Sequence, residues 1–303
     1  MNDNLLRRGF LMRSMGIAAS ALAVRPEMVF AAGEVKRKAG TRIRIGLNAY
    51  SFNSPLMAGK MTVEDVIDYC TLHNVDGVDM TGYYFPGYPK VPSDETIYNL
   101  KKKAYLNGVS ITGTGVRNDF TIPDAAKRKG EIDLVKNWTE VAHKLGASVV
   151  RVFSGPRLPE GHTFDEVFEW MAPAFRECAE YGKKNGVMIG LQHHDDYLKT
   201  AEQTIRVVKA VNSEWFGVIL DVGSLRQGDP YEEIEKLLPY ACTWQVKENV
   251  YFGGKSTPID LPRVKAIIDK VGFRGFLPIE ALGRGDPEVI VTTFLEKVRK
   301  AMV

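Results

Sequence analysis

Four apolar segments in the second half of the chain each end in side chains that can bind a metal ion or move a proton. The first, residues 187–196 (VMIGLQHHDD), ends in an amide, two histidines and two aspartates. The three later segments follow the same design and end in Asp221, in Gln245 with Lys247, and in Glu280. A single polar residue at a strand end is commonly just hydrogen-bonded in place, but four in succession favour a shared site.

Strand parity sorts these residues by face, because alternate side chains of a strand point the same way. Gln192 and His194 share one face, and His193 takes the other as a structural histidine between strand and helix. Gln245 and Lys247 likewise share a face. His194 and Lys247 are therefore candidates for binding substrate or moving protons. For Lys247, hydrogen bonding to neighbouring carboxylates is an equally good interpretation.

The carboxylates and amides of these segments form a hard, oxygen-rich set, which suits Mn²⁺, Mg²⁺ or Co²⁺ better than a thiolate-seeking ion. We therefore expect one divalent metal ion, with Mn²⁺ favoured and Mg²⁺, Co²⁺ or Zn²⁺ as alternatives. Its expected ligands are Gln192, Asp221, Gln245 and Glu280. Such an ion can bind two vicinal oxygens of a sugar and stabilise an enediolate.

Polar and aromatic residues at other strand ends predict a carbohydrate pocket. Asn48 and Tyr50 share a parity at the end of the first predicted strand, and Arg151 lies near the end of the fourth. Aromatic rings beside hydrogen-bonding groups suit a sugar, whose rings have apolar faces and polar rims; core packing is the alternative for Tyr50. The loop 83–88 (YYFPGY) is expected to form a wall or lid over the substrate.

Short apolar runs alternate with longer amphipathic segments, which indicates an α/β fold with a parallel sheet. Early strands are expected at 43–52, 77–80, 110–116 and 148–153, with helices beginning near 62, 124, 163 and 200 and a glycine-bearing loop at 252–258. Eight strand–helix units in about 260 residues fit a (β/α)8 TIM barrel, in which all strand ends meet at one face. The competing doubly wound sheet is disfavoured, because neither GxGxxG nor GxxxxGKS follows the first strand.

Composition is that of a soluble globular protein, with 45% hydrophobic and 25% charged residues. A formal net charge of +3, spread along the chain, gives no nucleic-acid footprint. The three cysteines show no CxxC spacing, which argues against a disulfide framework or a structural zinc site. The expected partner is a small-molecule carbohydrate, and a homo-oligomer is left open.

The first residues have the features of a bacterial twin-arginine (Tat) export signal. Arg7 and Arg8 precede a modestly apolar stretch, 15–24, and small residues suited to cleavage follow at 29–32. We expect a signal peptide at 1–32, a linker at 33–42 and the barrel at 43–303. The mature protein would be periplasmic and would not bind the membrane; a cytosolic protein with a chance arginine pair is the alternative.

The order and spacing of LQHHDD, LDVGS, WQVKE and LPIE resemble the sugar phosphate isomerase/epimerase superfamily, the xylose isomerase-like TIM barrels. The resemblance covers residues 43–303. It implies one divalent metal held from strands five to eight, at the places of Gln192, Asp221, Gln245 and Glu280 in this chain. In epimerases of the family, the first and last of these places carry glutamates that act as the acid/base pair.

Two residues depart from the family pattern. Gln192 replaces the first glutamate, and an amide cannot exchange a proton as a carboxylate can. Ser224 stands where a histidine commonly contacts the substrate, and we assign the substrate contact there to Ser224. Glu280 is then the expected catalytic base, with His194 or Lys247 as its partner.

The sequence therefore predicts a metal-dependent sugar or keto-sugar isomerase or epimerase that works through an enediolate. One alternative is a carbohydrate-binding protein that has lost its catalytic base. The others are a sugar lyase or hydratase of the same fold, and a glycoside hydrolase built on Asp221 and Glu280.

Overall fold

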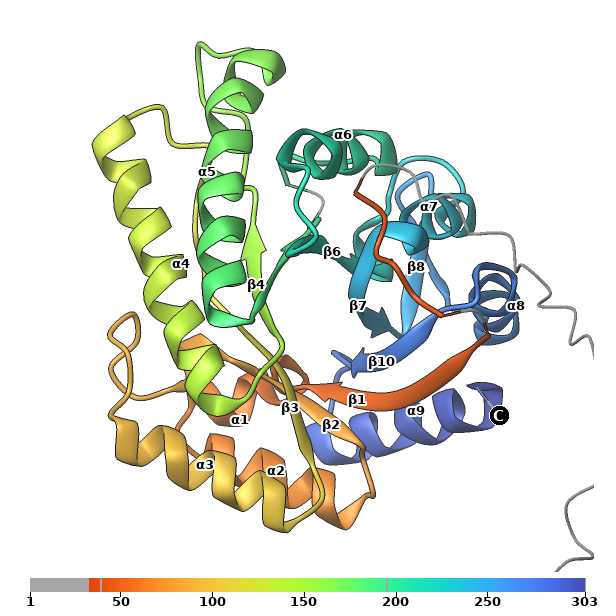
Figure 1. Ribbon diagram of the computed structural model, residues 1–303. Coiled ribbons are helices and arrows are strands. Elements are labelled where there is room, and N and C mark those ends of the chain that lie inside the picture. Colours follow the sequence, from red (N-terminus) through yellow and green to blue (C-terminus); the bar gives the residue numbers. More distant parts are fainter. Residues whose placement is uncertain (1–32, 39, 195, 303) are drawn as a thin grey trace, which may run out of the picture. The chain divides into compact units, whose positions relative to one another are not determined.

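A computed structural model describes residues 33–38, 40–194 and 196–302 of the chain. Parallel strands close into a barrel in the order β1-β10-β7-β6-β5-β4-β3-β2, and helices surround it (Figure 1). This confirms the predicted (β/α)8 TIM barrel and excludes the open doubly wound sheet. In such a barrel the carboxyl ends of all strands meet at one face, where side chains distant in sequence come together.

The barrel strands are β1 (Arg42–Asn48), β2 (Gly77–Thr81), β3 (Ser110–Gly115), β4 (Val149–Phe153), β5 (Met188–Gln192), β6 (Phe216–Asp221), β7 (Ala241–Lys247) and β10 (Arg274–Glu280). The helices are α1 (Asn53–Met57), α2 (Val63–Leu72), α3 (Asp94–Leu106), α4 (Ala125–Leu145), α5 (Phe164–Asn185), α6 (Ala201–Val211), α7 (Pro230–Leu237), α8 (Leu261–Val271) and α9 (Pro287–Met302).

The strand register aligns the polar strand ends. Gln192, the last residue of β5, pairs with Ile219 of β6, and Asp221 pairs with Gln245 across β6 and β7. Glu280, the last residue of β10, pairs with Lys247. The candidate site residues therefore all lie at the carboxyl ends of β5, β6, β7 and β10, on the same face of the barrel.

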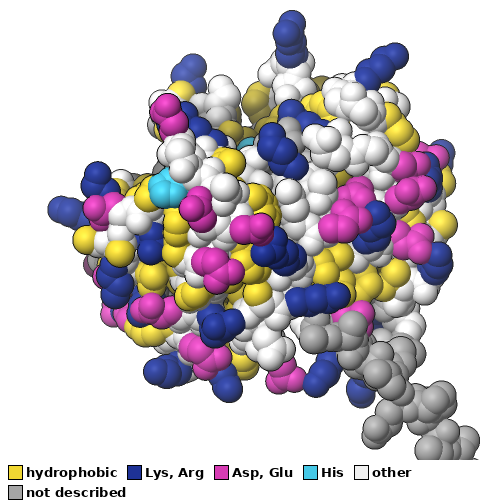
Figure 2. All heavy atoms as spheres, turned by 90° about the horizontal axis from the view of Figure 1, so that it is seen from above, with side chains coloured by type: hydrophobic (Ala, Val, Ile, Leu, Met, Phe, Trp, Pro, Cys, Tyr) yellow, Lys and Arg dark blue, Asp and Glu magenta, His cyan; other side chains and the backbone are white. Residues whose placement is uncertain are grey.

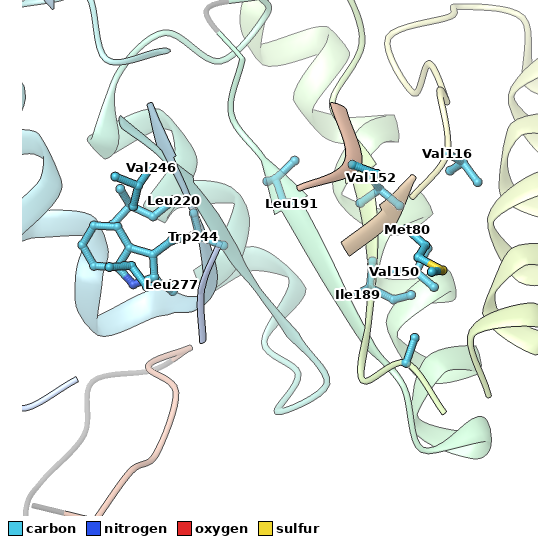
Figure 3. Close-up of a cluster of buried hydrophobic side chains, with 14 of the residues drawn as sticks. Met80, Val116, Val150, Val152, Ile189, Leu191, Leu220, Trp244, Val246 and Leu277 are labelled. Atoms are coloured by element: carbon cyan, nitrogen blue, oxygen red, sulfur yellow. The ribbon is translucent and has the colours of Figure 1, made fainter. Parts of the chain in front are cut away.

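The hydrophobic core between the barrel and its helices is built from the residues that alternate with the polar ones. Figure 3 shows this layer, and its labelled side chains are buried: Met80, Val116, Val150, Val152, Ile189, Leu191, Leu220, Trp244, Val246 and Leu277. Leu191, for example, precedes Gln192, and Val246 lies between Gln245 and Lys247. One parity thus fills the core, and the other parity carries the site.

Local sequence sets where the helices begin. Thr62, Thr163 and Thr200 cap α2, α5 and α6, and each forms a reciprocal capping box with the third residue of its helix. Asp124 caps α4 by accepting a hydrogen bond from the backbone N–H of Lys127. The helix starts predicted near 62, 124, 163 and 200 are confirmed to within a residue.

Two local predictions are wrong. The first strand, predicted at 43–52, ends at Asn48, because the Asn48 side chain accepts a hydrogen bond from Tyr50 N and caps a 3₁₀ turn over Ala49–Phe52. The loop expected at 252–258 is part of an antiparallel hairpin of β8 (Asn249–Phe252) and β9 (Lys255–Pro258). Gly253 and Gly254 both have positive φ, as a two-residue hairpin turn requires.

The segment before β1 lies against the amino-terminal end of the barrel. Arg37 donates hydrogen bonds to the backbone carbonyls of Arg274 and Ala241 at 2.8 and 2.7 Å, and its guanidinium lies over the Phe273 ring.

Charged side chains of both signs are interspersed on the face shown in Figure 2. Among the described residues, no helix is long and apolar enough to cross a membrane.

Candidate functional site

The structure brings Gln192, Asp221 and Gln245 into direct contact. The Gln192 side-chain amide donates one hydrogen bond to Asp221 Oδ2 at 2.7 Å and another to Gln245 Oε1. All three side chains are buried. The predicted convergence of these strand ends is therefore present in the fold.

Lys247 joins this cluster to Glu280. The Lys247 ammonium lies 2.9 Å from Asp221 Oδ2 and 3.2 Å from Glu280 Oε1. Asp221 is 0% exposed and Glu280 5% exposed, so both carboxylates are paired with a cation inside the protein. A buried carboxylate without such a partner would be strongly destabilising.

The two carboxylates differ in their protonation behaviour. Burial acts to raise the pKa of Asp221, but the charges of Lys247, His194 and His193 outweigh it and hold that pKa below its usual value. Burial raises the pKa of Glu280, and Lys247 offsets this only in part. Burial acts to lower the pKa of Lys247, but the two carboxylates raise it well above its ordinary value, so Lys247 stays protonated.

A cavity of about 610 Å³ opens over this cluster. Its lining comes from the carboxyl ends of the strands and the loops that follow them: Asn48, Tyr50, Thr81, Tyr83, Arg117, Asn118, Asp119, Glu131, Arg151, Phe153, Gly155, Pro156, Gln192, His194, Asp196, Gln245 and Glu280. The volume and the mix of aromatic and polar groups suit a ligand of sugar size.

A second cavity, of about 740 Å³, opens at the amino-terminal end of the strands. It includes Ser110, Ser148 and Thr243 but no Asp, Glu or His side chain. Without a group that moves protons near neutral pH, this cavity is a poor candidate for an active site.

Arg151 is the most distinctive donor in the first cavity. Its Nη1 donates to Gln192 Oε1 at 3.3 Å, and its guanidinium lies over the rings of Phe153 and Tyr83. The side chain is buried, yet its Nη2 has no hydrogen-bond partner. Gly115 makes room for it, because a Cβ there would lie 2.5 Å from Arg151 Nε. A buried donor left without a partner is expected to pair with a ligand.

The structure places the other predicted substrate residues in different ways. Asn48 and Tyr50 line the cavity, and Tyr83 of the predicted wall loop packs edge-on against Tyr50. Ser224 donates to Asp221 Oδ2 at 2.9 Å, is buried, and is not among the lining residues. Ser224 therefore hydrogen-bonds to Asp221 and does not line the cavity.

The neighbouring histidines separate as strand parity predicts. His194 lines the cavity, is exposed, and packs edge-on against Phe153. Partial burial lowers the pKa of His194, which favours the neutral form. His193 is buried, accepts a hydrogen bond from Asp221 N at 3.3 Å, and has a pKa lowered by burial to about 4. His193 is thus a structural residue of the site.

Sequence reasoning missed several lining residues. Asn118 and Asp119 lie in the loop that follows β3, a few residues beyond its end, so a search for polar residues after strand ends could have revealed them. Asp196 is the last residue of the motif 187–196 but was given no role; it accepts a hydrogen bond from Ser154 Oγ, and burial raises its pKa to about 6. Glu131 projects from α4 and accepts from Asp119 N, a position that no strand-end pattern indicates.

The side chains do not fit the divalent metal that the resemblance implies. Lys247 Nζ lies between the two carboxylates, and the nitrogen of the Gln192 amide, which cannot ligate a metal, faces Asp221 and Gln245. The metal ligands Gln192, Asp221, Gln245 and Glu280 stay a prediction, and this arrangement argues against it.

The chain is similar to a protein family and to several solved structures. Residues 67–300 match the family described as xylose isomerase-like TIM barrel. A D-psicose 3-epimerase from Clostridium cellulolyticum H10, solved with D-tagatose, is 16% identical with a TM-score of 0.69, and the alignment covers 86% of this chain and 99% of that one. A search of curated protein sequences finds no match.

Two further solved structures have a related fold. The IolI protein, described with a bound zinc atom, is 17% identical with a TM-score of 0.68, covering 86% of this chain and 96% of its own. A probable 3-DHS dehydratase, AsbF from Bacillus anthracis, is 14% identical with a TM-score of 0.66, covering 84% and 98%. At these identities the likeness shows the fold.

Proposed function

The chain belongs to the xylose isomerase-like TIM barrel family, and from this premise we propose that it removes a proton beside the carbonyl group of a sugar or keto-sugar. The outcome is isomerisation, epimerisation or elimination of water. The fold is shared with sugar epimerases and a dehydratase. The observation that carries the proposal is Glu280, a buried carboxylate of raised pKa that faces a sugar-sized cavity.

Glu280 acts as the base in this proposal. Its raised pKa makes the carboxylate more basic than one in water, which favours removal of a weakly acidic C–H proton. Lys247 stays protonated and holds Glu280 in place at the end of β10. No step passes through a metal ion, because the side chains of the site do not fit one.

Arg151 stabilises the negative charge that forms on the substrate. Its Nη2 has no partner inside the protein, and the side chain lines the same cavity as Glu280. The Arg151 charge also lowers the pKa of Glu280, which places the two groups within electrostatic reach. A fixed donor in a buried site stabilises a developing enolate oxygen more strongly than water does.

Glutamine at position 192 favours elimination or isomerisation over the two-glutamate epimerisation of the family. Gln192 occupies the place of the second base and cannot titrate. Glu280 returns the proton that it removed from carbon. His194, which lines the cavity and is mainly neutral at pH 7, is the proposed partner that accepts the proton of a substrate hydroxyl and passes it to the carbonyl oxygen. A glycoside hydrolase is disfavoured, because Asp221 is fully buried and is not among the lining residues.

Solvent exchange tests this proposal. The full chain is incubated in D₂O with a panel of neutral sugars and keto-sugars, and deuterium at carbon is measured by NMR and mass spectrometry. We expect one substrate to incorporate deuterium at carbon. Glu280→Gln should lower the rate of this exchange by about 10²- to 10⁴-fold. The same substitution at Glu169, exposed on α5, is the control and should leave the rate unchanged.

The alternative function is a carbohydrate-binding protein, which the loss of a titratable group at Gln192 favours. Saturable sugar binding with no deuterium exchange for any bound sugar would establish this alternative. Exchange that survives in Glu280→Gln would keep the enzyme but reject Glu280 as the base, and His194 would be tested next.

Export to the periplasm is proposed alongside this activity. It rests on Arg7, Arg8 and the apolar stretch that follows, which lie outside the described residues. A periplasmic enzyme would meet extracellular sugars and their oxidised derivatives, in agreement with a neutral sugar or keto-sugar substrate.

A further inference from the structure

We infer that the ammonium group of Lys247 replaces the divalent cation of the family site, so that this chain binds no metal there. The inference does not depend on the proposed reaction. It starts from position, since Lys247 Nζ contacts Asp221 and Glu280, which occupy two of the four places that the resemblance assigns to metal ligands. An ammonium at this point and a metal ion bound to the same oxygens exclude each other.

The charges of the site are balanced without a metal. Three carboxylates and a divalent ion in the family pattern carry a net formal charge of −1. In this chain Gln192 stands in place of one of the three carboxylates. The two remaining carboxylates, Asp221 and Glu280, together with the Lys247 ammonium give the same net formal charge of −1. The change from glutamate to Gln192 and the cation Lys247 therefore compensate each other, as a buried site requires.

The oxygens of Asp221 and the amide of Gln192 are paired by hydrogen bonds within the protein. Asp221 accepts from Gln192, Lys247, Ser224 and Gly223 N, the last at 3.0 Å. Arg151 donates to the oxygen of the Gln192 amide, which fixes its nitrogen toward Asp221 and Gln245. If the Gln192 amide were reversed, its NH₂ group would face the donor Arg151, and its oxygen would face two acceptors, Asp221 Oδ2 and Gln245 Oε1.

The backbone is shaped for the lysine. Gly223 lies in the turn after β6, and a Cβ there would lie 2.6 Å from Lys247 Cδ. Any larger residue at position 223 would obstruct the path of the Lys247 side chain to Asp221. Lys247 also shares the inward face of β7 with Gln245, so its position follows from the strand itself.

Metal binding to the full chain, stripped with EDTA, tests the inference without any substrate. The probe is Mn²⁺, followed by the loss of its free-ion EPR signal, with Zn²⁺ and Co²⁺ followed by calorimetry. The wild type should bind none stoichiometrically, and its Tm should not respond to EDTA or added Mn²⁺. A variant with Gln192→Glu, Gln245→His and Lys247→Met should bind one Mn²⁺ at least about 100-fold more tightly than the wild type.

Lys236 provides a matched control. Its ammonium also bridges two carboxylates, Glu202 at 2.8 Å and Glu233 at 2.9 Å, but on helices α6 and α7 and not at the strand ends that carry the candidate ligands. Lys236→Met should create no Mn²⁺ site, whereas Lys247→Met should lower Tm and make Tm rise with added Mn²⁺.

Two results would overturn the inference. One is stoichiometric Mn²⁺, Zn²⁺ or Co²⁺ binding by the wild type, whatever the effect of Lys247→Met. The other is a folded triple variant that binds no Mn²⁺, because Lys247 would then not occupy a metal position. If the triple variant does not fold, the wild-type titration alone decides.

Discussion

At the scale of single residues, Lys247 helps to make the two carboxylates of the site differ in pKa. It lies closer to Asp221 than to Glu280, and Asp221 also accepts hydrogen bonds from three other groups. These interactions favour the charged form of Asp221, while Glu280 remains the more basic group. A proton arriving in the site therefore goes to Glu280, the carboxylate that lines the cavity.

Strand parity explains how much of this the sequence could predict. The faces of Gln192, His194 and Gln245 follow directly from the alternation of a strand, and the separation of His193 from His194 is confirmed. Parity predicts only the face of Lys247. Its contact with both carboxylates depends on the distance between β6, β7 and β10, which no local pattern contains.

His193 makes stability depend on pH. Its pKa is about 4 in the folded protein against an ordinary 6.5, so the unfolded chain binds the proton first as pH falls. The free energy of unfolding should therefore fall between pH 6.5 and 4, by up to about 3 kcal/mol from this residue. His193→Gln keeps an acceptor for Asp221 N and should flatten the curve in this window, measured by chemical denaturation.

Comparison at pH 8 controls for other effects of His193→Gln, because histidine is neutral there in both states. The difference in unfolding free energy between wild type and variant should be constant above pH 7 and change only below it. A difference that stays constant down to pH 4 would show that His193 is not buried in its neutral form.

At the scale of elements, the same rules explain both the correct and the incorrect predictions. Helix starts were predictable because Thr62, Thr163 and Thr200 form capping boxes, a purely local interaction. The end of β1 was not, because the Asn48 cap competes with extension of the strand. Glu131 reaches the cavity from α4 only through the packing of that helix, so sequence gave no signal for it.

The packing of α5 against β5 depends on one small residue. Gly182 faces the start of β5, and a Cβ there would lie 2.4 Å from the backbone oxygen of Val187. Gly182→Ala should force α5 away from the barrel and destabilise the protein by about 1 to 3 kcal/mol, measured by urea denaturation.

Gly130 is the matched control on α4. It is exposed, and a Cβ there would meet nothing within 4 Å. Gly130→Ala should stabilise the protein by about 0.5 to 1 kcal/mol, since alanine is the better helix former. Equal effects of the two substitutions would mean that Gly182 has no packing role.

At the scale of the whole molecule, the barrel closes only when its ends meet. Residues 42–47 of β1 pair in parallel with 274–279 of β10, so the first strand has its second neighbour only after nearly the whole chain is made. The sequence predicted this closure from the number of strand–helix units, because a (β/α)8 barrel needs all eight.

Barrel closure bears on the export prediction. A Tat route carries folded proteins, and a barrel closed by its first and last strands must be complete before it can be carried as one unit. Replacing Arg7 and Arg8 with Lys keeps the charge but removes the arginine pair. We expect the variant to accumulate in the cytosol, measured by cell fractionation of the bacterial host.

The retained protein distinguishes loss of the signal from loss of the fold. Because 1–32 precede the barrel, the double lysine variant should be soluble, with the Tm of the wild-type barrel. Replacing Arg13 and Arg25 with Lys, outside the pair, should leave export intact. Unchanged periplasmic levels of the Arg7 and Arg8 variant would reject the Tat interpretation, and an unfolded cytosolic product would mean that residues before β1 are needed for the barrel to close.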